Sequence, residues 1–256
     1  MNVFSADIIA KFLTVLWPLI RITTALMTAP VFSAEAANVR VRLMFAIALT
    51  ALIYPTRDWP VIDPVSPAGL SAIFNEIAIG AIMGFTLQII ASALIIAGQA
   101  ISATMGLSMA NLLDPNSGNV PVLSEFLMIM STLIFLGMGG HILFVTVIAE
   151  SFNALPTGQS LLSLASVSGM LAWSSMLFLG ALLVSLPVIS AILLINAGLG
   201  IVTRAAPSLN IFSVGLPATI IAGFIMLIIS MTGIGNRMVW LWQQGFEKIH
   251  TILGIT

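Results

Sequence analysis

Charged residues are scarce in this chain. Only 7% of its 256 residues are Asp, Glu, Lys or Arg, whereas 59% are hydrophobic and the mean hydropathy is +1.16. A soluble domain has roughly a quarter of its residues charged. So few charges cannot cover a surface that faces water. Most of the surface must therefore face lipid or other protein, and the composition predicts an integral membrane protein.

Cysteine is absent and histidine is nearly so, which excludes several kinds of site. Without cysteine there is no disulfide, thiolate metal ligand or cysteine nucleophile. His141 and His250 are the only histidines, and the sequence has no H-E-x-x-H pair, phosphate-binding glycine loop or nucleophile elbow. The net charge of −1 supplies no basic field for nucleic acid. We expect no enzyme activity, no metal or cofactor, and no nucleic-acid partner.

Long hydrophobic runs dominate the sequence that remains. A helix of about 20 apolar residues crosses a bilayer. By this criterion six candidate helices emerge, at roughly 8–29, 40–56, 70–103, 122–149, 169–203 and 212–235. The joining segments are short and rich in turn residues, so no soluble domain fits between them. We expect one all-α membrane domain over residues 1–256.

Several of these candidates are poor examples of a simple span. Segment 70–103 would run about 50 Å as one helix, against a hydrocarbon core of about 30 Å. Segment 169–203 is similarly long and contains Pro187, which removes a helix hydrogen bond and is expected to bend the helix. Bent and overlong helices are tolerated where other protein covers the freed backbone groups. This pattern suggests a subunit that is buried among neighbours.

Ionisable groups inside the candidate spans are few. Arg21 lies deep in the first span, and Glu76 lies in the first two turns of the third. Charges at such depth mark either a transport pathway or a pair that neutralises each charge. We favour pairing, because a proton-driven transporter would bury more ionisable groups at the midplane.

Small and amide residues on the third span indicate helix packing. Gly80 and Gly84 form a small-xxx-small pair, which lets two helices approach closely. Gln88 and Gln99 are three helical turns apart and so share a face. We expect these amides to form hydrogen bonds between helices.

One interruption near the middle of the chain mixes turn residues with apolar ones. Residues 106–121 read GLSMANLLDPNSGNVP, and the D-P-N-S-G run is a strong turn signal. Residues alone favour an ordinary surface loop whose first half is helical.

Four blocks occur in order along the chain. They are residues 21–42 (RITTALMTAPVFSAEAANVRVR), 76–114 (E-x-x-x-G-x-x-x-G-F through to D-P), 135–141 (FLGMGGH) and 204–217 (RAAPSLNIFSVGLP). Their order, their spacing and the total length resemble the FliR family, the flagellar type III export-gate subunit, and its injectisome counterparts. The turn around residues 33–36 lacks the proline expected before V-R-V-R. The resemblance covers nearly the whole chain.

The resemblance implies a non-enzymatic gate subunit in the bacterial inner membrane, at the flagellar basal body. FliP-type and FliQ-type subunits, with a FlhB-type subunit, would be its partners in a helical, pore-forming assembly embedded in membrane lipid. Unfolded flagellar proteins would pass through that pore.

The resemblance also assigns roles to residues. It places the central interruption in the channel lumen as a plug, where apolar side chains close the pore and turn residues permit movement. The plug residues would be Met105, Met109, Leu112, Leu113, Asp114, Pro115, Asn116 and Gly118. Residues expected in helix packing or subunit interfaces are Arg21, Glu76, Gly80, Gly84, Gln88, Gln99, Arg204, Pro207, Asn210, Phe212, Gly215 and Pro217. A tight inter-helix turn capped by Asn210 and Ser213 is the structural alternative for the last block.

Two other functions remain as alternatives. A stand-alone secondary transporter would need inverted repeats and a polar midplane site, and neither is clear in the sequence. An intramembrane enzyme is disfavoured by the missing catalytic groups. The match favours a flagellar over an injectisome system without deciding between them.

Overall fold

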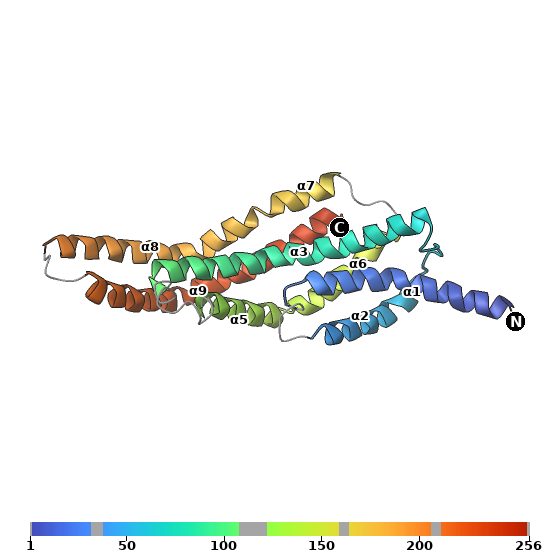
Figure 1. Ribbon diagram of the computed structural model, residues 1–256, viewed down its shortest axis with the longest axis horizontal. Helices are drawn as coiled ribbons and strands as arrows, with labels where there is room; N and C mark the ends of the chain where they lie inside the picture. Colours follow the sequence, from blue (N-terminus) through green and yellow to red (C-terminus); the bar gives the residue numbers. More distant parts are fainter. Residues whose placement is uncertain (1, 32–37, 108–121, 159–163, 206–210, 255–256) are drawn as a thin grey trace. The chain divides into compact units, whose positions relative to one another are not determined.

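The computed structural model describes residues 2–31, 38–107, 122–158, 164–205 and 211–254 (Figure 1). Within these ranges the chain is helical and contains no strand. The elements are α1 (Asn2–Thr28), α2 (Val39–Ile53), η1 (Tyr54–Thr56), α3 (Pro67–Thr104), α5 (Val122–Gly137), α6 (Gly140–Ala154), α7 (Leu164–Trp173), α8 (Met176–Ala205) and α9 (Ile211–Leu253). The prediction of an all-α membrane protein is confirmed.

The described helices include several that are long and apolar enough to cross a membrane. By length and composition four stretches qualify: Val39–Thr56, Pro67–Thr104, Ser166–Ala205 and Gly215–Leu253. Helices α5 and α6 together form a fifth candidate, which is broken between them. The chain is therefore a multi-pass membrane protein.

The predicted fourth span, 122–149, is two helices rather than one. Helix α5 ends at Gly137 and α6 begins at Gly140, with Gly139 at φ +75°. This left-handed conformation suits glycine because glycine has no Cβ atom. The G-M-G-G run is thus the place where the helix is interrupted.

The predicted fifth and sixth spans also differ from the structure. Helix α8 continues through Pro187, and the interruption falls earlier, at Ser174 and Ser175, between α7 and α8. The Ser174 hydroxyl donates to the Leu171 carbonyl at 2.6 Å, a local bond that competes with helix continuation. Helix α9 runs to Leu253 instead of ending near residue 235. Polar residues end the apolar run there, but they do not end the helix.

The chain folds as two compact units. The first comprises Met1–Ile89, Gly139–Ser174 and Gln243–Thr256, and the second comprises Ile90–Met138 and Ser175–Trp242. The expectation of one membrane domain over the whole chain stays a prediction.

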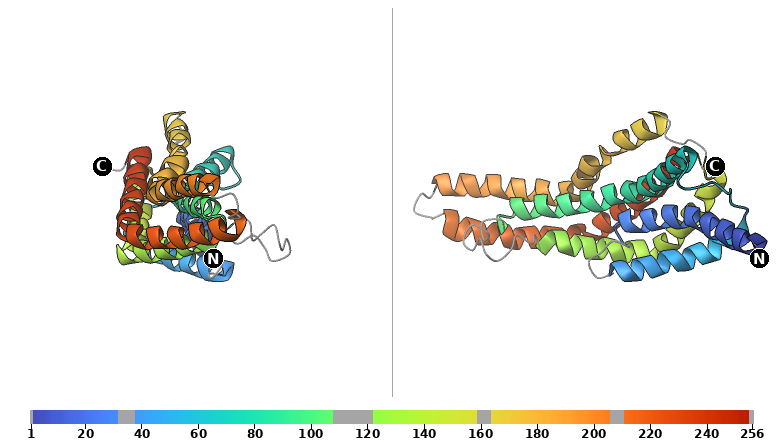
Figure 2. Two further views of the ribbon diagram at one scale, coloured as in Figure 1. Left: turned by 90° about the vertical axis from the view of Figure 1, so that its left-hand side faces the viewer. Right: turned by 45° about the vertical axis from the view of Figure 1, so that its right-hand side comes forward.

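In the first unit, α1 packs against both α2 and α3. Helices α1 and α2 lie side by side in every view (Figure 2), and Trp17 of α1 is completely buried. Glycines bring α3 close to α1: a Cβ atom at Gly80 would lie 2.6 Å from the Arg21 carbonyl oxygen, and one at Gly84 would lie 2.8 Å from the Ala29 nitrogen. The small-xxx-small pair therefore allows a close contact between α1 and α3 of the same chain.

The second unit uses the same kind of contact between other helices. A Cβ atom at Gly98 of α3 would lie 2.4 Å from the Ser124 Cα of α5. The Ser124 hydroxyl donates to the Ile95 carbonyl at 2.9 Å. On α9, Trp242 donates to the Ser131 hydroxyl at 3.0 Å and packs on Phe135, with ring centroids 4.7 Å apart. Close backbones and buried hydrogen bonds therefore join α3, α5 and α9 here.

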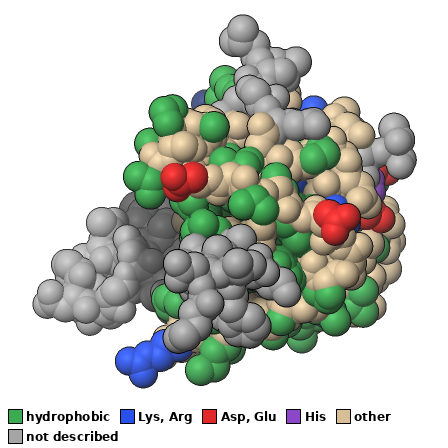
Figure 3. Space-filling view, turned by 90° about the vertical axis from the view of Figure 1, so that its right-hand side faces the viewer, with side chains coloured by type: hydrophobic (Ala, Val, Ile, Leu, Met, Phe, Trp, Pro, Cys, Tyr) green, Lys and Arg blue, Asp and Glu red, His purple; other side chains and the backbone are tan. Residues whose placement is uncertain are grey.

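Large apolar side chains remain exposed along several helices. On α2, α8 and α9 they include Val41, Met44, Ile47, Leu52, Phe178, Leu182, Leu194, Ile201, Ile221, Ile225, Ile228 and Ile229. Figure 3 shows one face of the molecule, on which charged side chains are few and scattered among hydrophobic ones. Such a surface suits lipid or neighbouring protein rather than water.

The substitution Gly80→Ala tests the contact between α1 and α3. Alanine normally stabilises a helix interior relative to glycine by about 0.5–1 kcal/mol. We expect the opposite here, a loss of about 1–3 kcal/mol, because the added methyl group meets the α1 backbone. Thermal unfolding in detergent measures the effect. Gly233→Ala on α9 is the matched control, since no described atom lies within 4 Å of a Cβ there. Equal melting shifts in both variants would contradict the close packing.

Candidate functional site

The most strongly polar feature in the interior of the first unit is a buried ion pair. Arg21 of α1 is completely buried, and Glu76 of α3 is 1% exposed. The Arg21 Nε atom donates to Glu76 Oε2 at 2.6 Å, and Nη2 donates to Glu76 Oε1 at 3.0 Å. This is the two-pronged arrangement that gives arginine–carboxylate pairs both strength and a fixed orientation.

The end of α6 supplies the remaining partners of the guanidinium. Arg21 Nη1 donates to the Ser151 hydroxyl at 3.1 Å, and Nη2 donates to the Leu155 carbonyl at 2.8 Å. The Ser151 hydroxyl in turn donates to the Ile148 carbonyl at 2.7 Å. The Phe152 ring lies 4.1 Å from Arg21 Cζ, close enough for a cation–π interaction. One arginine therefore connects α1, α3 and α6.

Helical spacing explains why the charges meet where the backbones approach. Residues 76, 80 and 84 are four apart and so share one face of α3. Glu76 carries the charge on that face, while Gly80 and Gly84 remove the side chains that would hold α1 away. The Arg21 carbonyl lies against Gly80 while its guanidinium reaches Glu76.

Sequence reasoning singled out Arg21 and Glu76 and favoured a pairing role over a transport pathway. The structure joins them to each other. The sequence reasoning missed three further contributions at the end of α6, those of Ser151, Phe152 and Leu155. The one available signal was Leu155-Pro156, because a residue before proline tends to end a helix and the last carbonyls of a helix lack internal partners. Nothing in the sequence marked Ser151 or Phe152.

The amides and the proposed plug residues have different surroundings. On α3, Gln88 is half-buried and Gln99 is exposed. Met105 is completely buried in the second unit, where a Cβ atom at Gly223 would lie 2.6 Å from its Cγ. The Thr219 hydroxyl donates to the Met105 carbonyl at 3.4 Å. The other expected plug residues lie outside the described part of the chain: Met109, Leu112, Leu113, Asp114, Pro115, Asn116 and Gly118.

The last block is described only in part. Arg204 is exposed at the end of α8, and Pro207 and Asn210 lie outside the described residues. Phe212 is in the first turn of α9, and Gly215, which is buried, comes one turn later. Pro217 is exposed within the same helix.

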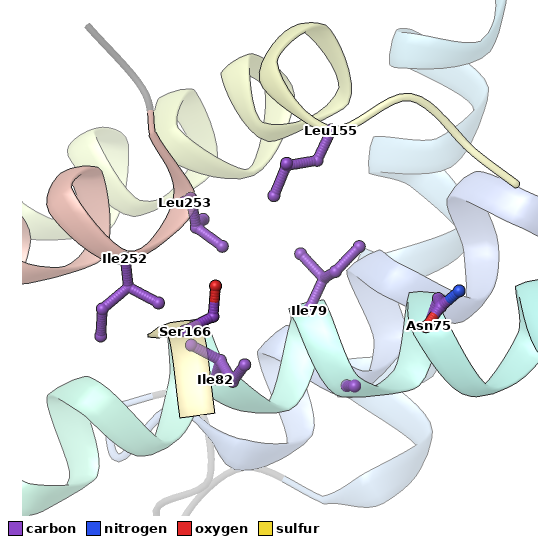
Figure 4. Close-up of a pocket in the computed structure, with 8 residues that line it drawn as sticks. Asn75, Ile79, Ile82, Leu155, Ser166, Ile252 and Leu253 are labelled. Carbon is purple, nitrogen blue, oxygen red and sulfur yellow. The ribbon is translucent and has the colours of Figure 1, made fainter. Parts of the chain in front are cut away.

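A small apolar cavity lies between α3, α7, the end of α6 and the end of α9 in the first unit. Ile79 and Leu155 extend toward the same space, with Leu253 on another side and the Ser166 hydroxyl directed into it (Figure 4). Its volume is about 10 Å³, roughly the space of one water molecule. It is too small to hold a solute.

Comparisons with known proteins cover nearly the whole chain. The family model described as "Bacterial export proteins, family 1" matches residues 12–245. Flagellar biosynthetic protein FliR of Pectobacterium carotovorum subsp. carotovorum is 32% identical over 238 residues, which cover 93% of this chain and 91% of that protein. The protein of the same name from Escherichia coli (strain K12) gives the same values. That of Bacillus subtilis (strain 168) is 32% identical over 230 residues, 88% of each chain.

Removing one member of the ion pair should destabilise the fold strongly. We expect Glu76→Gln to lower the free energy of unfolding by about 3–5 kcal/mol, because the buried Arg21 charge loses its counter-charge. The double variant Arg21→Met, Glu76→Gln should recover part of this loss. Thermal melting of the full chain in detergent reports both. Glu247→Gln, at an exposed glutamate of α9, should melt like the unaltered chain. A Glu76→Gln variant of unchanged stability would show that the pair does not hold the unit together.

Proposed function

The chain belongs to family 1 of the bacterial export proteins, and from this membership we propose that it is a non-enzymatic channel subunit of a flagellar type III protein export gate. The family match over residues 12–245 carries the proposal, since it takes in every candidate span except the last residues of α9. The subunit assembles in the bacterial inner membrane at the flagellar basal body. FliP-type and FliQ-type subunits, with a FlhB-type subunit, complete the pore for unfolded flagellar proteins.

The hydrogen bonds of Arg21 support a structural rather than a transporting role for the buried charges. A guanidinium has five N–H donors, and Arg21 makes four hydrogen bonds to partners within the chain. Glu76 uses both carboxylate oxygens in the same pair. Little hydrogen-bonding capacity is left to bind a passing solute.

Exposed amides on apolar helices support assembly with neighbours. Gln99 of α3 and Asn196 of α8 are exposed within candidate membrane spans of the second unit. Hydrocarbon offers an amide no hydrogen-bond partner, whereas a helix of another subunit does. We infer that both amides face FliP-type or FliQ-type helices in the assembled gate.

The assembly proposal predicts which proteins are purified together. A tagged full chain, extracted gently from flagellated cells, should bring FliP-type and FliQ-type subunits with it. Asn196→Leu and Gln99→Leu should each lower their yield several-fold, because each loses a hydrogen bond between helices. Gln243→Leu, which alters an exposed amide near the end of α9, should not. Recovery of a lone chain that moves a small solute into liposomes would contradict the gate proposal.

If residues 106–121 plug the pore, shortening this segment should cause an ion leak. Flexible apolar side chains such as Met and Leu can close a constriction and repack when it opens. Deleting residues 112–118 should therefore raise ion conductance through the reconstituted complex while its subunit composition stays the same. Unchanged conductance in a normally assembled complex would exclude a plug at this loop.

A further inference from the structure

A cavity beside Arg57 lies within the first unit, between the segment after η1 and the segment after α6. Its volume is about 350 Å³, and Arg57, Asp58, Trp59, Phe152 and Thr157 contribute to its walls. A second cavity of about 330 Å³ shares the first three of these residues. Together they are far larger than the cavity in Figure 4, and charged and aromatic side chains line them.

Two polar atoms of the cavity walls lack partners. Arg57 Nε and Thr157 Oγ1 are buried, and neither has a hydrogen-bond partner among the described residues. Buried polar groups are nearly always paired, so two unpaired donors in the walls of one cavity call for an explanation. Both atoms are buried, but both side chains line the cavity, so a change of side-chain rotamer would turn either donor toward an oxygen atom inside it.

The walls of this cavity carry one side chain of each charge, Arg57 and Asp58. Arg21 and Arg57 both lie over the Phe152 ring, with Cζ 4.1 Å and 5.6 Å from its centroid. Glu76 neutralises Arg21. Arg57 donates to the Ala149 carbonyl at 3.3 Å but forms no ion pair within the described part of the chain. Arg57 is therefore a cation without an ion-pair partner among the described residues, in a cavity that the carboxylate of Asp58 also lines.

The position in the sequence indicates the depth of the cavity in the membrane. Arg57 follows the candidate span Val39–Thr56 directly, and the next candidate span begins at Pro67. A segment between two such spans would lie at a boundary between lipid and water. Tyr54 and Trp59 stack with ring centroids 6.3 Å apart, and such aromatic residues gather at the depth of the lipid headgroups.

We propose that this cavity binds the headgroup of a membrane phospholipid, whose phosphate accepts hydrogen bonds from Arg57 and Thr157. Asp58 lines the same cavity and would repel a headgroup that carries only negative charge. A zwitterionic headgroup places its ammonium group beside this carboxylate. The chemistry of the walls therefore selects phosphatidylethanolamine over phosphatidylglycerol.

Native mass spectrometry of the full chain in mild detergent tests the site. The chain is titrated with phosphatidylethanolamine or phosphatidylglycerol, and the bound lipid is counted. Arg57→Gln should weaken retention of phosphatidylethanolamine roughly tenfold, because it removes a charged donor. Thr157→Val keeps the side-chain shape and should weaken retention about threefold, as expected for a neutral hydrogen bond. Asp58→Asn should abolish the preference between the two lipids.

Control variants separate a built site from general attraction between arginine and lipid. Arg40→Gln removes the same charge from an exposed position on α2 and should leave retention unchanged. If Arg57→Gln unfolds the chain, the results for Thr157→Val and Asp58→Asn still test the proposed lipid site. Equal retention in all variants, or an equal loss in Arg40→Gln, would overturn the proposal. A last titration uses inorganic phosphate in place of lipid. If phosphate binds the site while lipid retention is the same in all variants, the ligand is a free anion and the proposal fails.

Discussion

The ion pair between Arg21 and Glu76 constrains the first unit more than any other contact. A guanidinium taken out of water must find both a counter-charge and hydrogen-bond acceptors, or its burial is prohibitively unfavourable. The counter-charge is on α3, and the remaining acceptors are at the end of α6. Because these partners come from different helices, the need to satisfy a single side chain constrains where α1, α3 and α6 lie.

Close backbone packing makes that arrangement possible, and it recurs where no charge is involved. In lipid, apolar surfaces gain little by meeting each other, so helices associate through tight contacts and hydrogen bonds. Gly80 provides such a contact in the first unit, and Gly98 with Ser124 provides one in the second. The ion pair adds specificity to this packing: it selects one register between α1 and α3 from the several that small residues alone would allow.

The sequence predicted the class of the protein better than its breaks and pairings. Scarce charge and long apolar runs were sufficient to predict an all-α membrane protein, because a lipid environment requires both features of the sequence. The breaks at Gly139 and at Ser174 were not predicted, since an apolar run conceals a helix interruption that leaves hydropathy unchanged. The partner of Arg21 could not be predicted either. Arg21 and Glu76 are 55 positions apart and meet only because of the register between two helices, which local sequence patterns do not encode. Most of the expected gate residues fall in 108–121, outside the described residues.

Glycines on the outer surface of the second unit give one further argument for neighbouring subunits. At Gly198 on α8 and Gly233 on α9, an added Cβ would meet no described atom within 4 Å. Glycine lowers helix stability relative to alanine, and no contact among the described residues of this chain offsets that loss at either position. A helix of another subunit can offset it, because a surface without side chains lets a second backbone approach closely. The exposed amide of Asn196 lies four residues before Gly200, on the same face of α8, and an added Cβ at Gly200 would likewise meet no described atom within 4 Å. Tight packing and a hydrogen bond, the two interactions that join helices inside this chain, are therefore both available at one stretch of its outer surface, which supports the proposed assembly with other subunits.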